Sequence, residues 1–395
     1  MRRLLIAIAL LAILSLLFTV EERRPSQTID TSKHSSVGST EVVSLLKSTD
    51  TGGFSRVESP RDLTFPPDHG PHPDMQIEWW YTTSNLESAE GHRYGVEVTF
   101  FRFGLPKSTP SIERQSAWAT DDLFMAHFAL TDVRRKKFHS FERFSRNSLG
   151  LAGAEAEPWR VWNETWSLTA QSGGPLPFPL TLRADGDHDG EKISVELQLD
   201  GLEPPLLQGD RGYSRKGPEP GNASHYYSYP RLEASGSIEI GGVTTPVEGL
   251  AWFDHEWSTS VLSEGLAGWD WFALQFEDGT ELMVYEMRRD DGTSSPFSVG
   301  VWIDGESVHR LSCDHFQLTV LDSWRSSITG IEYPSRWKIE VPSHALSVEV
   351  VPVLADQELR LSTLYWEGAV DVSGSRNGWG YVELVGYGEQ EQPPE

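Results

Sequence analysis

From residue 65 onward, apolar and polar residues alternate in short runs that are bounded by Gly, Asp, Asn or Pro. The run at 192–200 (K-I-S-V-E-L-Q-L-D) places its isoleucine, valine and two leucines on one face. The same period of two occurs at 236–240, 281–287, 346–350 and 368–372. This period predicts an all-β protein, because helical periodicity is scarce and turn residues recur at short spacing. Closure of the sheets into antiparallel barrels would remove exposed edge strands.

Three sequence blocks occur in the same order in both halves of the chain. E-W-W-Y…G-V-E-V-T-F-F-R resembles W-D-W-F…L-M-V-Y-E-M-R, the segment 166–210 resembles 337–358, and G-S-I-E-I-G-G resembles G-A-V-D-V-S-G. The repetition predicts two similar β domains that arose by duplication, at residues 58–250 and 251–390. A crevice between two domains is a preferred place for a ligand site.

The amino terminus differs in character from the rest of the chain. Two arginines precede an apolar run, Leu4–Val20, and the segment 21–57 is rich in Ser, Thr and charge. Residues 1–20 therefore predict a signal peptide or an uncleaved membrane anchor, with residues 4–20 as the apolar part, and the segment 21–57 predicts a flexible tether. Both alternatives predict export of the remaining chain, to the periplasm or beyond the cell.

Composition narrows the function classes. The 395 residues carry a formal net charge of -25, which argues against binding to nucleic acid or anionic lipid, since both need basic patches. One cysteine, Cys313, permits neither an intramolecular disulfide nor a cysteine-based zinc site. The sequence contains no P-loop, dinucleotide fingerprint or H-E-x-x-H motif, so we expect no nucleotide cofactor and no metal.

The segment 251–272 (A-W-F-D-H-E-W…G-W-D-W-F) concentrates ionisable groups among indoles. Its members are Asp254, His255, Glu256, Asp270, Trp252, Trp257, Trp269 and Trp271. Contact with indoles desolvates such groups, which raises the pKa of a carboxyl and lowers that of a histidine. Tryptophan faces also attract cations. The segment therefore suits proton transfer through a positively charged intermediate.

Strand alternation places Asp254 and Glu256 on one face and His255 with Trp257 on the other. A buried histidine needs a polar partner, and Asp270 on the next predicted strand is the natural candidate. One interpretation is an acid–base pair within an aromatic pocket, and the other is a structural pair that joins two strands.

Two further segments contain candidate residues. In F-P-P-D-H-G-P-H-P-D-M-Q-I-E-W-W-Y, Glu78 and Trp80 alternate on a strand and are candidates to line the first barrel or the domain interface. The acids and histidines that precede them lie in a Pro- and Gly-rich loop, where an aspartate more often caps a turn than binds metal. In the segment 208–229, His225 and Tyr227 follow a Gly/Pro-rich loop and belong either to a lid over a ligand or to the barrel rim.

Long motifs of this chain resemble the AttH-like family, which is related to carotenoid 1,2-hydratases and often labelled "predicted secreted hydrolase". They are F-P-P-D-H-G-P-H-P-D-M-Q-I-E-W-W-Y, L-Q-G-D-R-G-Y-S-R-K-G…N-A-S-H-Y-Y-S-Y-P-R-L and A-W-F-D-H-E-W-S-T-S…G-W-D-W-F-A-L-Q. The resemblance extends from about Phe65 to Tyr387. It implies two lipocalin-like β-barrels in tandem.

The resemblance also implies an activity, the cofactor-independent addition of water to an alkene of a lipophilic, isoprenoid-type molecule. His255, Trp257 and Asp270 match the His-x-Trp element and the downstream aspartate of the hydratase branch. We expect Asp270 to protonate the alkene, His255 to take a proton from water and Asp254 to orient His255. We expect the tryptophans at 252, 257, 269 and 271 to bind substrate or stabilise the cation. A secreted ester hydrolase and a non-catalytic carrier of lipophilic ligands are the alternatives.

Overall fold

The computed structural model describes residues 53–105, 120–171, 173–259, 262 and 265–389, and most of these lie in β-strands. The described helices are four single 3-10 turns, η1 (Pro67–His69), η2 (Ser148–Gly150), η3 (Pro342–His344) and η4 (Tyr387–Glu389). None of the helices among these residues has the length and apolar character needed to cross a membrane. The predicted all-β class is confirmed. The predicted leader, residues 1–20, lies outside the described residues.

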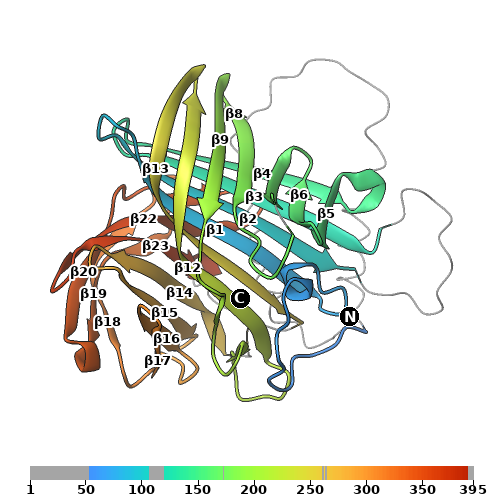
Figure 1. The fold of residues 1–395 in the computed structure, drawn as a ribbon. Helices are drawn as coiled ribbons and strands as arrows, with labels where there is room; N and C mark the ends of the chain where they lie inside the picture. The colour runs from blue at the N-terminus through green and yellow to red at the C-terminus, as the bar shows by residue number, and fades with distance from the viewer. Residues whose placement is uncertain (1–52, 106–119, 172, 260–261, 263–264, 390–395) are drawn as a thin grey trace, which may run out of the picture. The chain divides into compact units, whose positions relative to one another are not determined.

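Thirteen strands form the first sheet, drawn in blue to yellow in Figure 1. They are β1 (Ile77–Glu87), β2 (Arg93–Gly104), β3 (Asp122–Asp132), β4 (Lys137–Arg146), β5 (Ala152–Ala156), β6 (Trp159–Asn163), β7 (Trp166–Ala170), β8 (Leu180–His188), β9 (Glu191–Asp200), β10 (Leu206–Leu207), β11 (Tyr213–Arg215), β12 (Ala223–Ile240) and β13 (Val243–Ser258). The hydrogen-bonded order is β4-β3-β2-β1-β13-β12-β9-β8-β7-β6-β5, and β10 and β11 also pair with β12. Because β4 packs beside β5 and β6, the sheet curls into a nearly closed barrel.

Ten strands form the second sheet, drawn in orange to red in Figure 1. They are β14 (Leu266–Phe276), β15 (Thr280–Arg289), β16 (Val299–Asp304), β17 (Ser307–Ser312), β18 (Gln317–Arg325), β19 (Glu332–Val341), β20 (Leu346–Pro352), β21 (Glu358–Arg360), β22 (Leu364–Gly374) and β23 (Gly378–Val385). The order is β17-β16-β15-β14-β23-β22-β20-β19-β18, with β21 on β22. No ladder joins β17 to β18 in the described part of the chain, so this sheet is a half-barrel.

The two sheets repeat one topology. The path β2-β1-β13-β12-β9-β8 in the first sheet corresponds to β15-β14-β23-β22-β20-β19 in the second. In both paths a hairpin of consecutive strands is joined, through its first strand, to the last strand of the domain. The first and third repeated sequence blocks fall on corresponding strands, and so does the S-V-E run of the second block, on β9 and β20; its tryptophans do not, since Trp166 lies on β7 and Trp337 on β19. The matching blocks have the arrangement expected of a duplicated domain.

Two predicted boundaries need correction. The junction between the domains does not fall at residues 250 and 251, because β13 continues to Ser258 and pairs with β1 along the whole of that strand. The change of sheet lies between β13 and β14. The predicted tether also ends earlier than residue 57, since Phe54 and Val57 are buried and the Ser55 amide donates to the Asp74 carbonyl at 2.8 Å.

Buried apolar residues form three clusters, which follow from strand alternation. One fills the first barrel and includes Trp80, Phe253 and Trp257. A second fills the half-barrel and includes Phe272 and Trp337. The third lies between the sheets, where the outward faces of β1, β2 and β13 meet those of β14, β22 and β23. The outward faces are therefore apolar as well, because each sheet covers the other.

Candidate functional site

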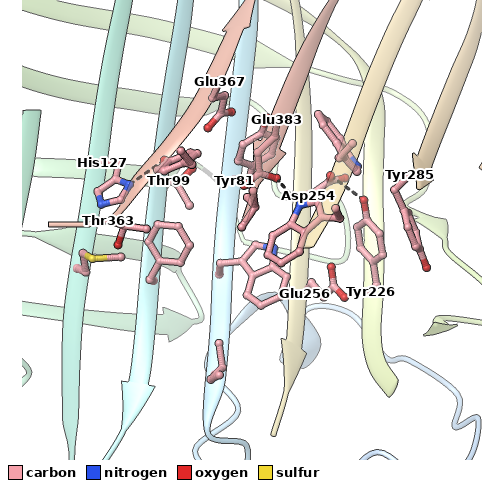
Figure 2. A pocket seen from close by; sticks show the side chains of 18 of the residues that line it. Tyr81, Thr99, His127, Tyr226, Asp254, Glu256, Tyr285, Thr363, Glu367 and Glu383 are labelled. Atoms are coloured by element: carbon pink, nitrogen blue, oxygen red, sulfur yellow. Dashed lines mark hydrogen bonds between the residues drawn. The ribbon is translucent and has the colours of Figure 1, made fainter. Parts of the chain in front are cut away.

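A cavity of about 120 Å³ lies between the two sheets. Its walls come from the outward faces of both, as Figure 2 shows for β1, β2, β3 and β13 on one side and the strands of the second sheet on the other. Trp79, Phe103 and Trp269, at one end, are half-buried and form an apolar opening. At the other end the sheets touch, since a Cβ at Gly95 would lie 2.7 Å from the Cβ of Ala369. The predicted crevice between domains is thus present.

Asp254 is the buried acid that the first sheet contributes to this cavity. Its Oδ1 accepts hydrogen bonds from Trp252 Nε1 at 2.8 Å and from Ser228 Oγ at 2.5 Å, and its Oδ2 accepts one from Tyr226 Oη at 2.7 Å. Burial raises the pKa of Asp254 to about 7, although these three hydrogen bonds act to lower it. The side chain therefore changes charge near neutral pH.

Glu383, on β23, is the acid that the second sheet contributes. Trp269 Nε1 donates to its Oε2 at 3.1 Å. Burial raises the pKa of Glu383 to about 7 against the effect of that bond, and the charges of Glu256 and Asp254 raise it further. Two carboxyl groups from different domains thus line one cavity, and both have a pKa of about 7. Such a pair can supply an acid and a base at the same pH.

Around this pair the cavity is lined by aromatic and polar side chains. Tyr81 lines the cavity together with the two acids, and Trp271 packs edge-on against Tyr81, with 5.2 Å between the ring centroids. Lys216 forms an ion pair with Glu256 at 3.0 Å, so that acid is already compensated. The cavity combines desolvated acids with aromatic faces, as the sequence predicted for the segment 251–272.

The site residues predicted from the sequence fall in three places. Asp254, Trp269 and Trp271 line the cavity, and Trp252 packs beside it. Six others lie inside the first barrel; they are Glu78, Trp80, His225, Tyr227, His255 and Trp257. Asp270 faces the interior of the half-barrel, where Arg288 Nε donates to it at 2.8 Å and Tyr387 Oη at 2.9 Å.

The predicted hydrogen bond between His255 and Asp270 is therefore wrong. His255 Nε2 bonds to Glu78 Oε1 at 2.9 Å and Nδ1 bonds to Tyr227 Oη at 3.2 Å, so both ring nitrogens have other partners. The prediction that β13 directs His255 away from Asp254 is confirmed. The prediction that Asp254 orients His255 is wrong, because the two side chains lie on opposite faces of one sheet.

Inside the first barrel, His255 belongs to a closed polar network. Glu78 accepts hydrogen bonds from Arg102 Nε at 2.8 Å, from His72 Nδ1 at 2.7 Å and from the His72 amide at 2.9 Å. Burial lowers the pKa of His255 to about 4, so this ring is neutral at pH 7. The pKa of Glu78 is lowered well below its usual range, since the His72 charge and the hydrogen bonds outweigh its burial. The network joins the loop before β1 to the end of the barrel.

Of the described residues, His72, Glu78 and His255 bring three candidate metal-ligand atoms within 4.8 Å of one another. Their ligand atoms already pair with one another through the hydrogen bonds given above, and His72 Nε2 bonds to Asp68 Oδ1 at 3.0 Å. His72 also stacks on Trp257 at 3.8 Å. Hydrogen bonding and stacking therefore account for this cluster.

The sequence profile of the AttH-like family matches residues 56–387. The chain belongs to this family. An AttH protein of Nitrosomonas europaea shares 32% identity and a TM-score of 0.73 with this AttH-like chain, over 85% of it and 100% of the relative. Kievitone hydratase of Nectria haematococca has the same fold, at 15% identity and a TM-score of 0.61, over 84% of this chain and 98% of its own. The dehydratase asqC of Emericella nidulans is 23% identical over 224 residues, which span 52% of this chain and 61% of asqC.

Sequence reasoning missed Glu383, Tyr226 and Tyr81 as cavity residues. Glu383 occurs in G-Y-V-E-L-V, where the alternation of Tyr381 and Glu383 with Val382 and Leu384 was visible. An outward face with tyrosine and glutamate has the appearance of a solvated surface. Only the packing of the other sheet against it makes that face the wall of a site.

Proposed function

We propose that this AttH-like protein is a hydro-lyase that adds water to, or removes it from, a lipophilic substrate held between its two sheets. The observation that carries the proposal is the placement of Asp254 and Glu383 in one aromatic cavity, one from each domain. Burial holds the pKa of both groups near 7, so a protonated and an ionised carboxyl coexist at neutral pH. Hydration of an alkene and dehydration of an alcohol both use one acid and one base in this way.

The hydrogen bonds decide the roles. Three donors surround Asp254 and stabilise its carboxylate, so Asp254 is the base, whereas Glu383 accepts one hydrogen bond and is the acid. In hydration, Glu383 transfers its proton to one alkene carbon and the other carbon becomes a cation. Water adds to the cation and gives a proton to Asp254, which leaves an alcohol. In dehydration, each carboxyl performs the reverse step.

Aromatic side chains support the intermediate. Tyr81, Trp269 and Trp271 line the cavity, and the face of each such ring can stabilise a nearby cation by roughly 0.5–2 kcal/mol. The sequence-based hypothesis gave this part to Trp257 and Trp269, and of these two Trp269 lines the cavity. The reaction uses the chain's own carboxyl groups for both proton transfers.

The names of two relatives support this class of reaction, since one is a dehydratase and the other a hydratase. The resemblance to carotenoid 1,2-hydratases supports an isoprenoid-type alkene as the substrate, and the apolar opening of the cavity suits such a molecule. Export to the periplasm or beyond, through residues 1–20, completes the proposal. Because the proposed reaction needs no diffusible cofactor, the enzyme could work outside the cytoplasm without a cofactor supply.

The test is a turnover assay in isotopically labelled water. We expect wild-type protein, incubated with lipophilic alkenes and alcohols extracted from the source cells, to incorporate labelled oxygen into an alcohol. We expect Asp254→Asn and Glu383→Gln each to reduce the rate by roughly 100-fold or more. Glu233→Gln, an exposed change on β12, is the matched control and should leave the rate unchanged.

Other outcomes would identify the alternatives. Release of an acid together with an alcohol would indicate an ester hydrolase, and a bound lipid that remains unchanged would indicate a carrier. Full activity in a folded Asp254→Asn or Glu383→Gln protein would refute the assigned roles.

A further inference from the structure

Two further carboxyl groups lie at the closed end of the cavity, in addition to Asp254 and Glu383, the pair that the proposed proton transfers need. Glu97 on β2 and Glu367 on β22 join Glu383 there, and both are at most 1% exposed. Tyr81 and Tyr381 lie among them on β1 and β23. We call Glu97, Glu367 and the two tyrosines the acidic end, which adjoins Glu383.

Four polar atoms of the acidic end make no hydrogen bond of good geometry among the described residues, although the hydroxyls of Tyr81 and Tyr365 lie near enough to the Glu367 carboxyl to lower its pKa. The four atoms are Glu97 Oε2, Glu367 Oε1, Tyr81 Oη and Tyr381 Oη. Buried polar atoms in native proteins nearly always have a partner, because an unpaired one costs about 1–3 kcal/mol. Tyr81 and Glu367 belong to the cavity wall, so a group placed in the cavity can supply the missing bonds.

The charge of that group follows from the surroundings. No lysine or arginine among the described residues forms an ion pair with Glu97, Glu367 or Glu383, while the nearby Lys216 is paired with Glu256. Burial raises the pKa of Glu97 to about 8 and that of Glu367 well above its usual range, with the charges of neighbouring acids adding to the effect on Glu367. A positively charged ligand would relieve this repulsion and let the acids ionise.

The size of the ligand follows from the spacing of the acids. The acidic end does not bring three ligand atoms within 4.8 Å of one another, whereas the described chain does so at His72, Glu78 and His255. A bare metal ion needs such close ligands. An organic cation spans a wider gap, and its ammonium group offers three hydrogen-bond donors to separate acceptors.

We infer that the acidic end recognises the ammonium group of a lipophilic amine whose apolar body lies toward Trp79, Phe103 and Trp269. The ammonium donates to Glu367 Oε1 and lies against the ring of Tyr81, both of which line the cavity, and its charge compensates the neighbouring Glu97. This inference rests on the proposed function, since it names the class of molecule that the same cavity accepts. It places the nitrogen at the closed end and the reacting carbons beside Asp254 and Glu383.

The experiment compares three probes of equal chain length on the full-length protein: octylamine, octanol and octanoate. Binding is followed by the fluorescence of the tryptophans that line the cavity and by calorimetry near neutral pH. We expect octylammonium to bind at least about tenfold more tightly than octanol, since hydrogen bonds to charged groups are worth that ratio or more, and octanoate to bind most weakly. Octanol binding as tightly as octylammonium would overturn the inference and indicate recognition of a neutral oxygen.

Variants test the named residues. Glu367→Gln and Glu97→Gln keep the side-chain shape, and each should weaken octylammonium by about tenfold while changing octanol by less than about threefold. Glu233→Gln on the exposed face of β12 is the control. An unchanged preference in both folded variants would overturn the inference. If a variant fails to fold, the comparison of the three probes on the wild-type protein still decides the question.

The two proposals can fail separately. Hydro-lyase turnover that depends on Asp254 and Glu383, together with no preference for octylammonium, would retain the function and reject the amine. A strong preference for octylammonium without any hydration or dehydration would retain the amine site and reject the reaction.

Discussion

Replacement of Asp254 by asparagine should stabilise the protein and greatly reduce the proposed hydro-lyase activity. The carboxyl group is buried, and its pKa rises from the ordinary value of 3.8 to about 7 on folding. Between these two pH values the folded chain retains a proton that the unfolded chain has released. Stability therefore falls as the pH rises from about 4 to about 7. Asparagine does not titrate, so the variant escapes this loss.

The size of the effect follows from the same two values. At ~1.36 kcal/mol per pH unit, the rise from 3.8 to about 7 corresponds to a penalty of about 4 kcal/mol above neutral pH. Asparagine keeps the local hydrogen bonds, because its Oδ1 can accept from Trp252 and Ser228 while its amide donates to Tyr226 Oη. The variant should thus be about as stable as wild type at about pH 4 and more stable by up to about 4 kcal/mol at about pH 8.

Urea unfolding, followed by tryptophan fluorescence at both pH values, measures the difference directly. Glu233→Gln provides the exposed control and should change stability by less than about 0.5 kcal/mol at either pH. The reasoning is refuted if the Asn variant is less stable than wild type at about pH 8, or if its advantage does not grow with pH. Stability gained where activity is lost is the behaviour expected of a site strained for function.

Three further predictions concern the framework. Arg102→Met removes the cation from a buried carboxylate and should cost about 3–5 kcal/mol in urea unfolding, whereas Arg183→Met, at an exposed ion pair, should cost less than about 1 kcal/mol. Burial lowers the pKa of His255 to about 4, so as the pH falls from 6.5 the unfolded chain binds a proton before the folded chain does, and the wild type loses up to about 3 kcal/mol of stability by about pH 4. His255→Gln should abolish this loss. Urea unfolding of both proteins at about pH 7 and about pH 5 tests the prediction. Gly95→Val should separate the sheets and lower the thermal midpoint by several degrees, since its Cβ would lie 2.7 Å from a Cβ of the second sheet; an unchanged midpoint would contradict the close contact.

Much of the fold could be predicted from periodicity and repetition. Alternation with a period of two depends only on strand geometry, so it identified the strands and the opposite faces of Asp254 and His255. The ordered repeat identified two domains of one topology. The position of the junction was less accessible, because Pro246 and Gly249 have the character of turn residues but lie inside β13, which continues past them to Ser258. Nothing in local sequence marks the point where a strand leaves one partner sheet.

The site was predicted in its place but not in its residues. An indole-lined cavity does lie between the two sheets, yet the buried acid that shares it with Asp254 is Glu383 and not Asp270. Selecting a partner across two sheets requires knowledge of which face of β14 points toward the first barrel. Alternation separates Asp270 from Trp269 and Trp271, but alternation alone does not say which of these faces is the shared one.

The repeat itself contains the information that resolves this choice. If E-W-W in the first domain is aligned with D-W-F in the second, Glu78 corresponds to Asp270 and the arginines at the ends of the two blocks, Arg102 and Arg288, correspond to each other. The structure shows that both pairs form the same contact, with an arginine Nε donating to the acid at 2.8 Å inside its own domain. Asp270 is therefore the second copy of an internal anchor. In a duplicated fold, an acid that recurs with its arginine in both halves belongs to the framework, and the acids without a counterpart, such as Asp254 on β13, are the better candidates for chemistry.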